Sequence, residues 1–205
     1  MLKIYLVRHG QDQDNASGIL NGRRDTPLTK LGEAQAHEVA EKIKNFGIVF
    51  DAVYTSPLKR TKMTAEIISS DTNSPKPIVL ENLIERDFGI MTGEPATSIK
   101  EKCAPNILQA ELITYFLSPE GAETFPDMII RAKTLLDAIK SQHKDASVLL
   151  VSHGDFGKML YAAFYDLPWK DVLLQFHFGN SELLLLSENS PGHDAHVFKI
   201  QQFNA

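Results

Sequence analysis

The chain has 205 residues, of which 43% are hydrophobic and 23% are charged, and its formal net charge at pH 7 is −5. This length predicts one globular domain with a substantial core, and the acidic balance excludes a general basic surface for nucleic acid or for an anionic membrane. The single cysteine, Cys103, has no partner for an intrachain disulfide. No apolar run approaches the roughly 20 residues that cross a bilayer. Met1–Val7 lacks the pattern of a signal peptide, so we expect a cytoplasmic protein that works without a membrane.

The first predicted element is a strand over residues 4–7. Its side chains are apolar and partly β-branched, and it stops at Arg8, His9 and Gly10. This pattern is typical of a parallel strand that is buried on both faces. The imidazole is therefore expected at the carboxyl end of a buried strand.

Three further elements are predicted in the first third of the chain. A polar loop over 11–25 leads into a helix over 29–46, where apolar side chains recur at core spacing. A second strand is predicted over 51–55. A serine and a proline then favour a helix over 57–69, since serine is a good N-cap and proline a good first helical residue. This helix would hold Arg60 in its first turn.

The middle of the chain is less regular. A short third strand is predicted over 77–80, and it leads into 81–87, which contains Glu85. Residues 89–118 mix glycine, proline and a weak helical pattern, which indicates a lid or an insertion.

The last third repeats the unusual strand ending. A strand predicted over 146–151 is followed by Ser152, His153 and Gly154. Helices are expected on either side of it, over 122–142 and 156–165. Two closing strands are expected as an antiparallel hairpin, over 181–186 and 196–202.

The alternation of strands and helices predicts an α/β fold, with a mostly parallel central sheet between helices on both faces as a three-layer sandwich. We expect a single domain over 1–205, with the lid or insertion at about 89–118. The carboxyl ends of parallel strands meet at one edge of a sheet, where ligands bind. His9 and His153 should therefore share one site.

The charges near the two histidines indicate the kind of ligand. Arg8 adjoins His9, and Arg60 should project from a helix N-terminus at the same edge. Guanidinium groups and helix N-termini both suit phosphate oxygens. The same positive charges disfavour a metal ion, and neither an HExxH nor a CxxC spacing is present, so we expect no metal and no cofactor.

An imidazole nitrogen is the expected nucleophile, since the sequence has neither a nucleophile elbow nor a P-loop. The adjacent guanidiniums should keep His9 neutral, and a protonated His153 would add charge against the phosphate oxygens. Glu85 is the best-placed acid for protonating the leaving group. Asp155 allows two orientations: toward the pocket, where it would oppose a second substrate anion, or into the start of its own helix.

The ordered motifs resemble the histidine phosphatase superfamily, also called the phosphoglycerate mutase-like family. The resemblance covers nearly the whole chain and rests on Leu6–Gly10, Asn15, Asn21–Gly22, Asp25–Gly32, Ser56–Thr61, Leu83–Gly89, Gly121–Thr124 and Ser152–Gly154. It implies the same fold. It also implies His9 as the phosphorylated nucleophile, Glu85 as the proton donor, and a phosphate pocket of Arg8, Arg60 and His153. Substrate contacts are implied for Asn15, Asn21, Gly22 and Gly154.

Three functions follow from this pattern. The first is a phosphatase that acts on a small phosphorylated metabolite through a phosphohistidine. The second is a bisphosphoglycerate-dependent phosphoglycerate mutase, and the third is a non-catalytic phospholigand-binding protein on the same fold. We expect the phosphatase, because 89–118 is short and holds Lys100 and Lys102 as its only cations. The protein is expected as a monomer or a homodimer.

Overall fold

The computed structural model describes residues 1–198. Its central sheet has the strand order β3-β2-β6-β1-β7-β8. The four parallel strands are β1 (Lys3–Arg8), β2 (Ala52–Thr55), β3 (Ile78–Val79) and β6 (Ser147–Ser152). The antiparallel strands at one edge are β7 (Leu183–Leu186) and β8 (His196–Phe198). The predicted α/β fold with a mostly parallel sheet is confirmed.

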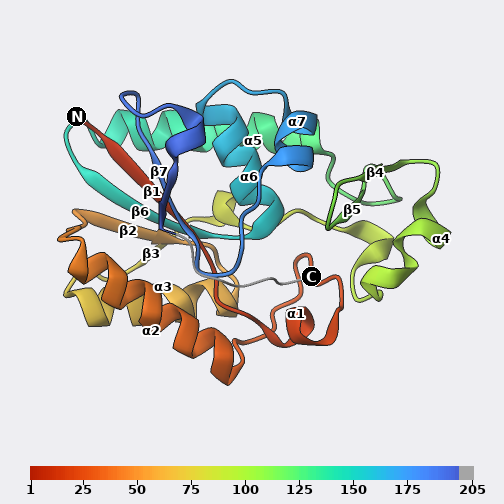
Figure 1. Ribbon diagram of the computed structural model, residues 1–205, viewed down its shortest axis with the longest axis horizontal. Coiled ribbons are helices and arrows are strands. Elements are labelled where there is room, and N and C mark those ends of the chain that lie inside the picture. Colours follow the sequence, from red (N-terminus) through yellow and green to blue (C-terminus); the bar gives the residue numbers. More distant parts are fainter. Residues whose placement is uncertain (199–205) are drawn as a thin grey trace.

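Helices cover both faces of this sheet (Figure 1). One face packs against α2 (Lys30–Asn45) and α3 (Lys59–Thr72), and the other against α5 (Phe125–Gln142), α6 (Gly154–Phe164) and α7 (Trp169–Gln175). In β1 the side chains of Tyr5 and Val7 enter the first core, while those of Ile4 and Leu6 enter the second. This alternation explains why β1 reads as a continuous apolar run.

The sheet register brings the two repeated strand endings together. β1 and β6 are parallel neighbours, and Arg8 pairs with Ser152. The backbone N–H of His9 then donates to the carbonyl of Ser152 at 3.0 Å. His9 and His153 consequently follow paired residues at the same edge, as the sequence predicts.

Several predicted boundaries shift, and two helices were missed. The loop 11–25 contains a short helix, α1 (Gln13–Ser17), which Asp12 caps, and α7 was not predicted at all. α3 begins at Lys59, two residues later than expected, and α6 begins two residues earlier. α5 begins at Phe125, where Thr124 and Asp127 form a capping box. The predicted strand 196–202 is β8 as far as Phe198, and its remainder lies outside the described residues.

Residues 89–118, which we name the insertion segment, lie beyond the carboxyl end of the parallel strands (Figure 1). The segment contains α4 (Ile99–Cys103), a hairpin of β4 (Ile107–Gln109) and β5 (Thr114–Phe116), and the 3-10 turns Gly89–Met91 and Ala96–Ser98. Two other 3-10 turns are Glu81–Leu83 and Gly192–Asp194. Phe88, just before the insertion segment, forms a small core with Met91, Ile99, Cys103 and Phe116 of the segment. Among the described residues, no helix is both long and apolar enough to cross a membrane.

A close backbone contact fixes the end of β1 against α2. A Cβ atom added at Gly10 would lie 2.2 Å from the carbonyl oxygen of Gly32 in α2. Because the opposing atom belongs to the backbone, we expect Gly10→Ala to lower the free energy of unfolding by about 3 kcal/mol, at the upper end of the usual overpacking cost. Thermal and denaturant unfolding would measure this loss.

Gly47→Ala is the matched control for this substitution. Gly47 has φ +66° but no heavy atom within 4 Å of the added Cβ, so the left-handed backbone is its one source of strain, worth about 1 kcal/mol. Equal losses for the two variants would contradict the packing argument.

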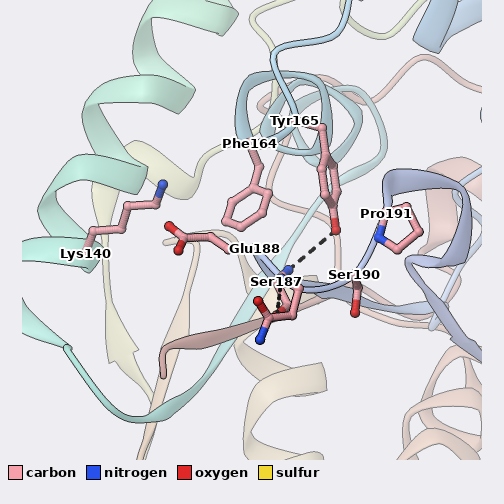
Figure 2. A pocket seen from close by; sticks show the side chains of 8 residues that line it. Lys140, Phe164, Tyr165, Ser187, Glu188, Ser190 and Pro191 are labelled. Carbon is pink, nitrogen blue, oxygen red and sulfur yellow. Dashed lines mark hydrogen bonds between the residues drawn. The ribbon is translucent and has the colours of Figure 1, made fainter.

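A cavity of about 560 Å³ opens at the opposite end of the sheet (Figure 2). Leu186 pairs with Ile4 at the start of β1, whereas His9 follows the end of that strand. The cavity is lined by Lys140, Phe164, Tyr165, Ser187, Glu188, Asn189, Ser190 and Pro191. It is therefore separate from the histidine site.

Candidate active site

Arg60 links the two histidines at the edge of the sheet. Its Nε–H is shared between Nε2 of His9 and Nδ1 of His153, each at 3.2 Å. The other guanidinium nitrogens donate to the carbonyls of Gly22 at 2.8 Å and Arg24 at 2.7 Å. All three side chains are buried, and the imidazole centroids lie 5.2 Å apart. The sequence-predicted grouping of His9, His153 and Arg60 is present.

The hydrogen bonds of His9 define its tautomer. Nδ1 lies 2.6 Å from the carbonyl oxygen of Gly10, which can only accept, so Nδ1 carries the proton. Nε2 is then the unprotonated ring nitrogen, and its lone pair accepts from Nε of Arg60. Burial, followed by the charges of Arg60 and Arg8, holds the pKa of His9 well below its usual value. His9 is therefore a neutral imidazole with an available nucleophilic nitrogen.

For His153 the sequence analysis considered a protonated ring, which would add charge against the phosphate oxygens. Burial and then the charge of Arg60 hold its pKa well below its usual value, so the ring is neutral. Its Nε2 lies 2.8 Å from the hydroxyl of Ser56. The sequence predicts Ser56 as a helix N-cap, but α3 starts after Leu58, and the Ser56 hydroxyl orients His153 instead. Next to two guanidiniums, the ring offers hydrogen bonds rather than charge.

Arg8 presents an unused donor to the site. One terminal nitrogen donates to the carbonyl of Phe178 at 3.0 Å. Its Nε is buried and has no hydrogen-bond partner among residues 1–198. A Cβ atom added at Gly154 would lie 3.4 Å from this Nε, so the glycine lets α6 approach the guanidinium. A buried, unpaired guanidinium donor favours an anionic ligand.

Glu85 lies at the N-terminus of α6. Its carboxylate accepts from the backbone N–H groups of Arg86 at 2.8 Å, Phe156 at 3.0 Å and Asp155 at 3.2 Å. These bonds and the helix N-terminus stabilise the charged form. Burial, and then the charge of Asp155, outweigh them and raise the pKa of Glu85. A carboxyl group with a raised pKa is suited to donate a proton.

Asp155 lies at the start of its own helix, which is the second of the two orientations that the sequence allows. It lies in the first turn of α6, and its Oδ2 is 3.7 Å from a terminal nitrogen of Arg86. Its charge also acts on the site, because it raises the pKa of Glu85.

Asn15, Asn21 and Gly22, for which the resemblance implies substrate contacts, form hydrogen bonds with other residues of the site. Asn21 donates to Oδ2 of Asp12 at 2.6 Å, and Gly22 accepts from Arg60. Asn15 accepts from Asn180 at 3.3 Å. Substrate contact by these residues stays a prediction.

Two site residues were missed by the sequence reasoning. Asp12 is buried, and its Oδ2 lies 3.3 Å from Nε of Arg60, so a carboxylate partly neutralises the pocket. The spacing of Asp12 and Asn15, which form a capping box, was an available signal. Asn180 donates to the carbonyl of His9 at 3.0 Å from the loop before β7, and no sequence pattern marks it.

The donor set in this site does not resemble a metal centre. Among the described residues, no group of three or more histidine, cysteine, aspartate or glutamate side chains is arranged to hold a metal ion. The cationic and neutral donors around His9 instead suit an oxyanion.

Comparisons with known proteins agree with this geometry. Residues 4–200 match the model of the histidine phosphatase superfamily (branch 1). The chain is 32% identical over 177 residues to a 2,3-bisphosphoglycerate-dependent phosphoglycerate mutase of Rhizobium etli, covering 84% of this chain and 85% of the relative. It is also 32% identical to the uncharacterized phosphatase PhoE of Bacillus subtilis, covering 75% of this chain and 72% of that protein.

Two solved structures have the same fold. A mycobacterial glucosyl-3-phosphoglycerate phosphatase in complex with VO3 has a TM-score of 0.77 at 26% identity, with 90% of this chain and 92% of that chain covered. A phosphoserine phosphatase of Entamoeba histolytica in complex with 3-phosphoglyceric acid has a TM-score of 0.75 at 26% identity, with 100% and 98% covered. Since the family model spans nearly the whole chain and includes both strand-end histidines, the chain belongs to the histidine phosphatase superfamily.

Proposed function

We propose that the protein is a phosphatase that hydrolyses a small phosphomonoester through a phosphohistidine at His9. The observation that carries this proposal is the neutral His9, whose Nε2 faces the Arg60 guanidinium. The buried and unpaired Nε of Arg8 supports it, because an incoming phosphate would satisfy that donor.

The reaction would proceed in two steps, which are phosphoryl transfer to His9 and hydrolysis of the phosphohistidine. Nε2 of His9 attacks phosphorus, the bond from phosphorus to the ester oxygen breaks, and Glu85 gives its proton to the leaving alkoxide. Water then attacks the phosphohistidine and loses a proton to Glu85, which releases phosphate and restores His9. Arg8, Arg60 and His153 would bind the phosphoryl oxygens throughout. We assign Asn15, Asn21, Gly22 and Gly154 to the substrate-facing wall.

The insertion segment favours a phosphatase over a mutase. A mutase must hold its released intermediate and exclude water, and a basic lid would help it to retain an anion. Lys102 is paired with Glu94 at 2.6 Å, and Lys100 is exposed. Lys102 is therefore engaged by a carboxylate of the same segment, and Lys100 is the one other cation that the segment holds. The relatives carry both activities in their names, so the choice needs an experiment.

The deciding experiment measures two products on the same protein. We expect phosphate release from a panel of phosphomonoesters without added bisphosphoglycerate, and little interconversion of 2- and 3-phosphoglycerate. Efficient interconversion that depends on bisphosphoglycerate, with negligible phosphate release, would favour the mutase. Tight phospholigand binding without either reaction would favour the non-catalytic protein.

The pH dependence should follow the two perturbed groups. The attacking His9 must be unprotonated, and its pKa lies well below the usual value, so kcat/KM should not fall until well below about pH 6.5. Glu85 must be protonated for the first step, so activity on alkyl phosphates should fall as pH rises through its raised pKa. A pH profile measured with an alkyl and an aryl phosphate checks this, because the alkaline fall should be weaker with the aryl ester. An equally steep alkaline fall with both esters would contradict it.

The cellular location and the oligomeric state of the protein are two further expectations. We expect the protein to act in the cytosol, and cell fractionation would test this. A monomer or a homodimer stays our prediction, which sedimentation velocity would check.

A further inference from the structure

A buried lysine lies between α6 and the insertion segment, outside the catalytic group described above. The side chain of Lys158 is 4% exposed, and its Nζ donates to the hydroxyl of Tyr115 at 2.6 Å. No carboxylate among residues 1–198 lies within ion-pair distance of this ammonium. An ammonium group has three donors, and burying it is costly unless they are used. Two of these donors have no described partner.

Helix geometry directs Lys158 toward the candidate active site. Lys158 is four residues after Gly154, so the two lie on the same face of α6, one turn apart. Side chains on a helix lean toward its N-terminus, and Gly154 has no side chain to block that path. Gly154 itself borders the guanidinium of Arg8, at 3.4 Å from an added Cβ. The ammonium therefore extends toward the turn of α6 that borders the proposed phosphate pocket.

Tyr115 brings a second donor to the same place from β5 of the insertion segment. Its side chain is buried, and burial raises its pKa, so the phenol stays protonated. Since the hydroxyl oxygen accepts from Lys158, its own hydrogen remains to donate, and no acceptor for it is found in the described part of the chain. A phenol and an ammonium that converge in this way match the two oxygens of a carboxylate.

We propose that Lys158 and Tyr115 bind a carboxylate on the organic part of the substrate, which makes phosphorylated carboxylic acids the preferred class. This inference rests on the proposed phosphatase function and adds the choice of substrate to it. It also adds to the expectation that the insertion segment has no basic cluster for a second acidic group. That expectation was drawn from the insertion segment, whereas the cation comes from α6.

The test compares substrates that differ only in the carboxylate. In Lys158→Met, kcat/KM for 3-phosphoglycerate should fall about 10- to 100-fold, the usual range for a lost hydrogen bond to a charged group. The value for glycerol 3-phosphate, which has an alcohol in place of the carboxylate, should change less than about 3-fold, within the measured effect of a neutral contact. Phosphoserine and phosphoethanolamine form a second pair. Lys133→Met removes an exposed lysine of α5 and should change neither value.

Different results distinguish the inference from the proposed function. Equal losses on both members of a pair, or no loss on either, would overturn carboxylate binding while phosphate release from p-nitrophenyl phosphate keeps the phosphatase assignment. Absence of phosphate release from every ester would instead overturn the phosphatase. In that case calorimetric titration still tests the role of Lys158. It compares the affinities for 3-phosphoglycerate and glycerol 3-phosphate in the unmodified protein and in Lys158→Met. Tyr115→Phe, which keeps the buried ring, should lower selectivity in the same direction and provides a second variant if Lys158→Met does not fold.

The pH dependence of selectivity gives an independent readout. Burial lowers the pKa of Lys158 to about 8. The charged groups around it are Asp155 on its own helix, Glu85, Glu182 and Arg8. Tyr115 faces it as a neutral phenol, and the charge of Lys158 contributes to the lowered pKa of His177, whose largest cause is burial. Because the charged ammonium binds the carboxylate, the preference for 3-phosphoglycerate should decline as pH rises through about 8. A preference that is flat across this range in the unmodified protein would contradict the assignment, and flatness is expected in Lys158→Met.

Discussion

Replacing His9 by alanine is expected to lower phosphate release by about 10⁴-fold or more, the scale on which loss of a nucleophile acts. The variant should also fail to form a covalent phosphoenzyme. The reason is that the two imidazoles turn different nitrogens toward Arg60. His9 turns its unprotonated Nε2 there, whereas His153 turns Nδ1 and holds its Nε2 against the hydroxyl of Ser56. Brief exposure to a ³²P-labelled substrate, followed by acid and alkaline treatment, measures the label, which is acid-labile and base-stable on histidine.

His37 supplies the matched control. It is an exposed histidine of α2 whose Nδ1 contacts Asp71, and it lies away from the site. His37→Ala should keep both labelling and turnover. A phosphoenzyme that persists in His9→Ala would place the nucleophile elsewhere.

The second large effect is expected for Glu85→Gln. Turnover of alkyl phosphates should fall about 10²–10⁴-fold, because the alkoxide would leave without a proton. Aryl phosphates with a good leaving group need less assistance and should lose much less. The amide can still accept at the Oε1 position from Arg86 and Phe156, so the loop should keep its place. Steady-state kinetics with both ester types measure the loss of turnover on alkyl phosphates relative to the loss on aryl phosphates.

Glu81→Gln is the corresponding control, since Glu81 is an exposed carboxylate in the 3-10 turn just before Glu85. It should leave both rates unchanged. Equal losses on alkyl and aryl esters in Glu85→Gln would argue that Glu85 only positions α6.

The sequence predicts the part of the site that depends on strand order. His9 and His153 follow two similar apolar runs, and parallel pairing of those runs is enough to bring the imidazoles together. Arg60 was placed correctly as well, although α3 starts two residues later than expected. Its position near the N-terminus of the helix needs only the strand before it.

The parts that could not be predicted depend on side chains from distant segments. Ser56 has the local signature of an N-cap, but its hydroxyl contacts His153, which is 97 residues away in the chain. Lys158 and Tyr115 are 43 residues apart in the chain. Their contact depends on how the insertion segment, which holds Tyr115, folds against α6. Propensities and periodicity describe local structure, so they carry no information about such pairs.

The shared hydrogen bond of Arg60 has a consequence for the end of the catalytic cycle. The Arg60 Nε–H serves two imidazole acceptors, while the carbonyls of Gly22 and Arg24 accept from the other guanidinium nitrogens. When inorganic phosphate leaves, these internal bonds re-form in place of those lost to the product, and water does not have to replace every one of them. Product departure should therefore cost less at Arg60 than at Arg8, whose Nε has no partner among residues 1–198. Inhibition by inorganic phosphate should accordingly depend mainly on Arg8.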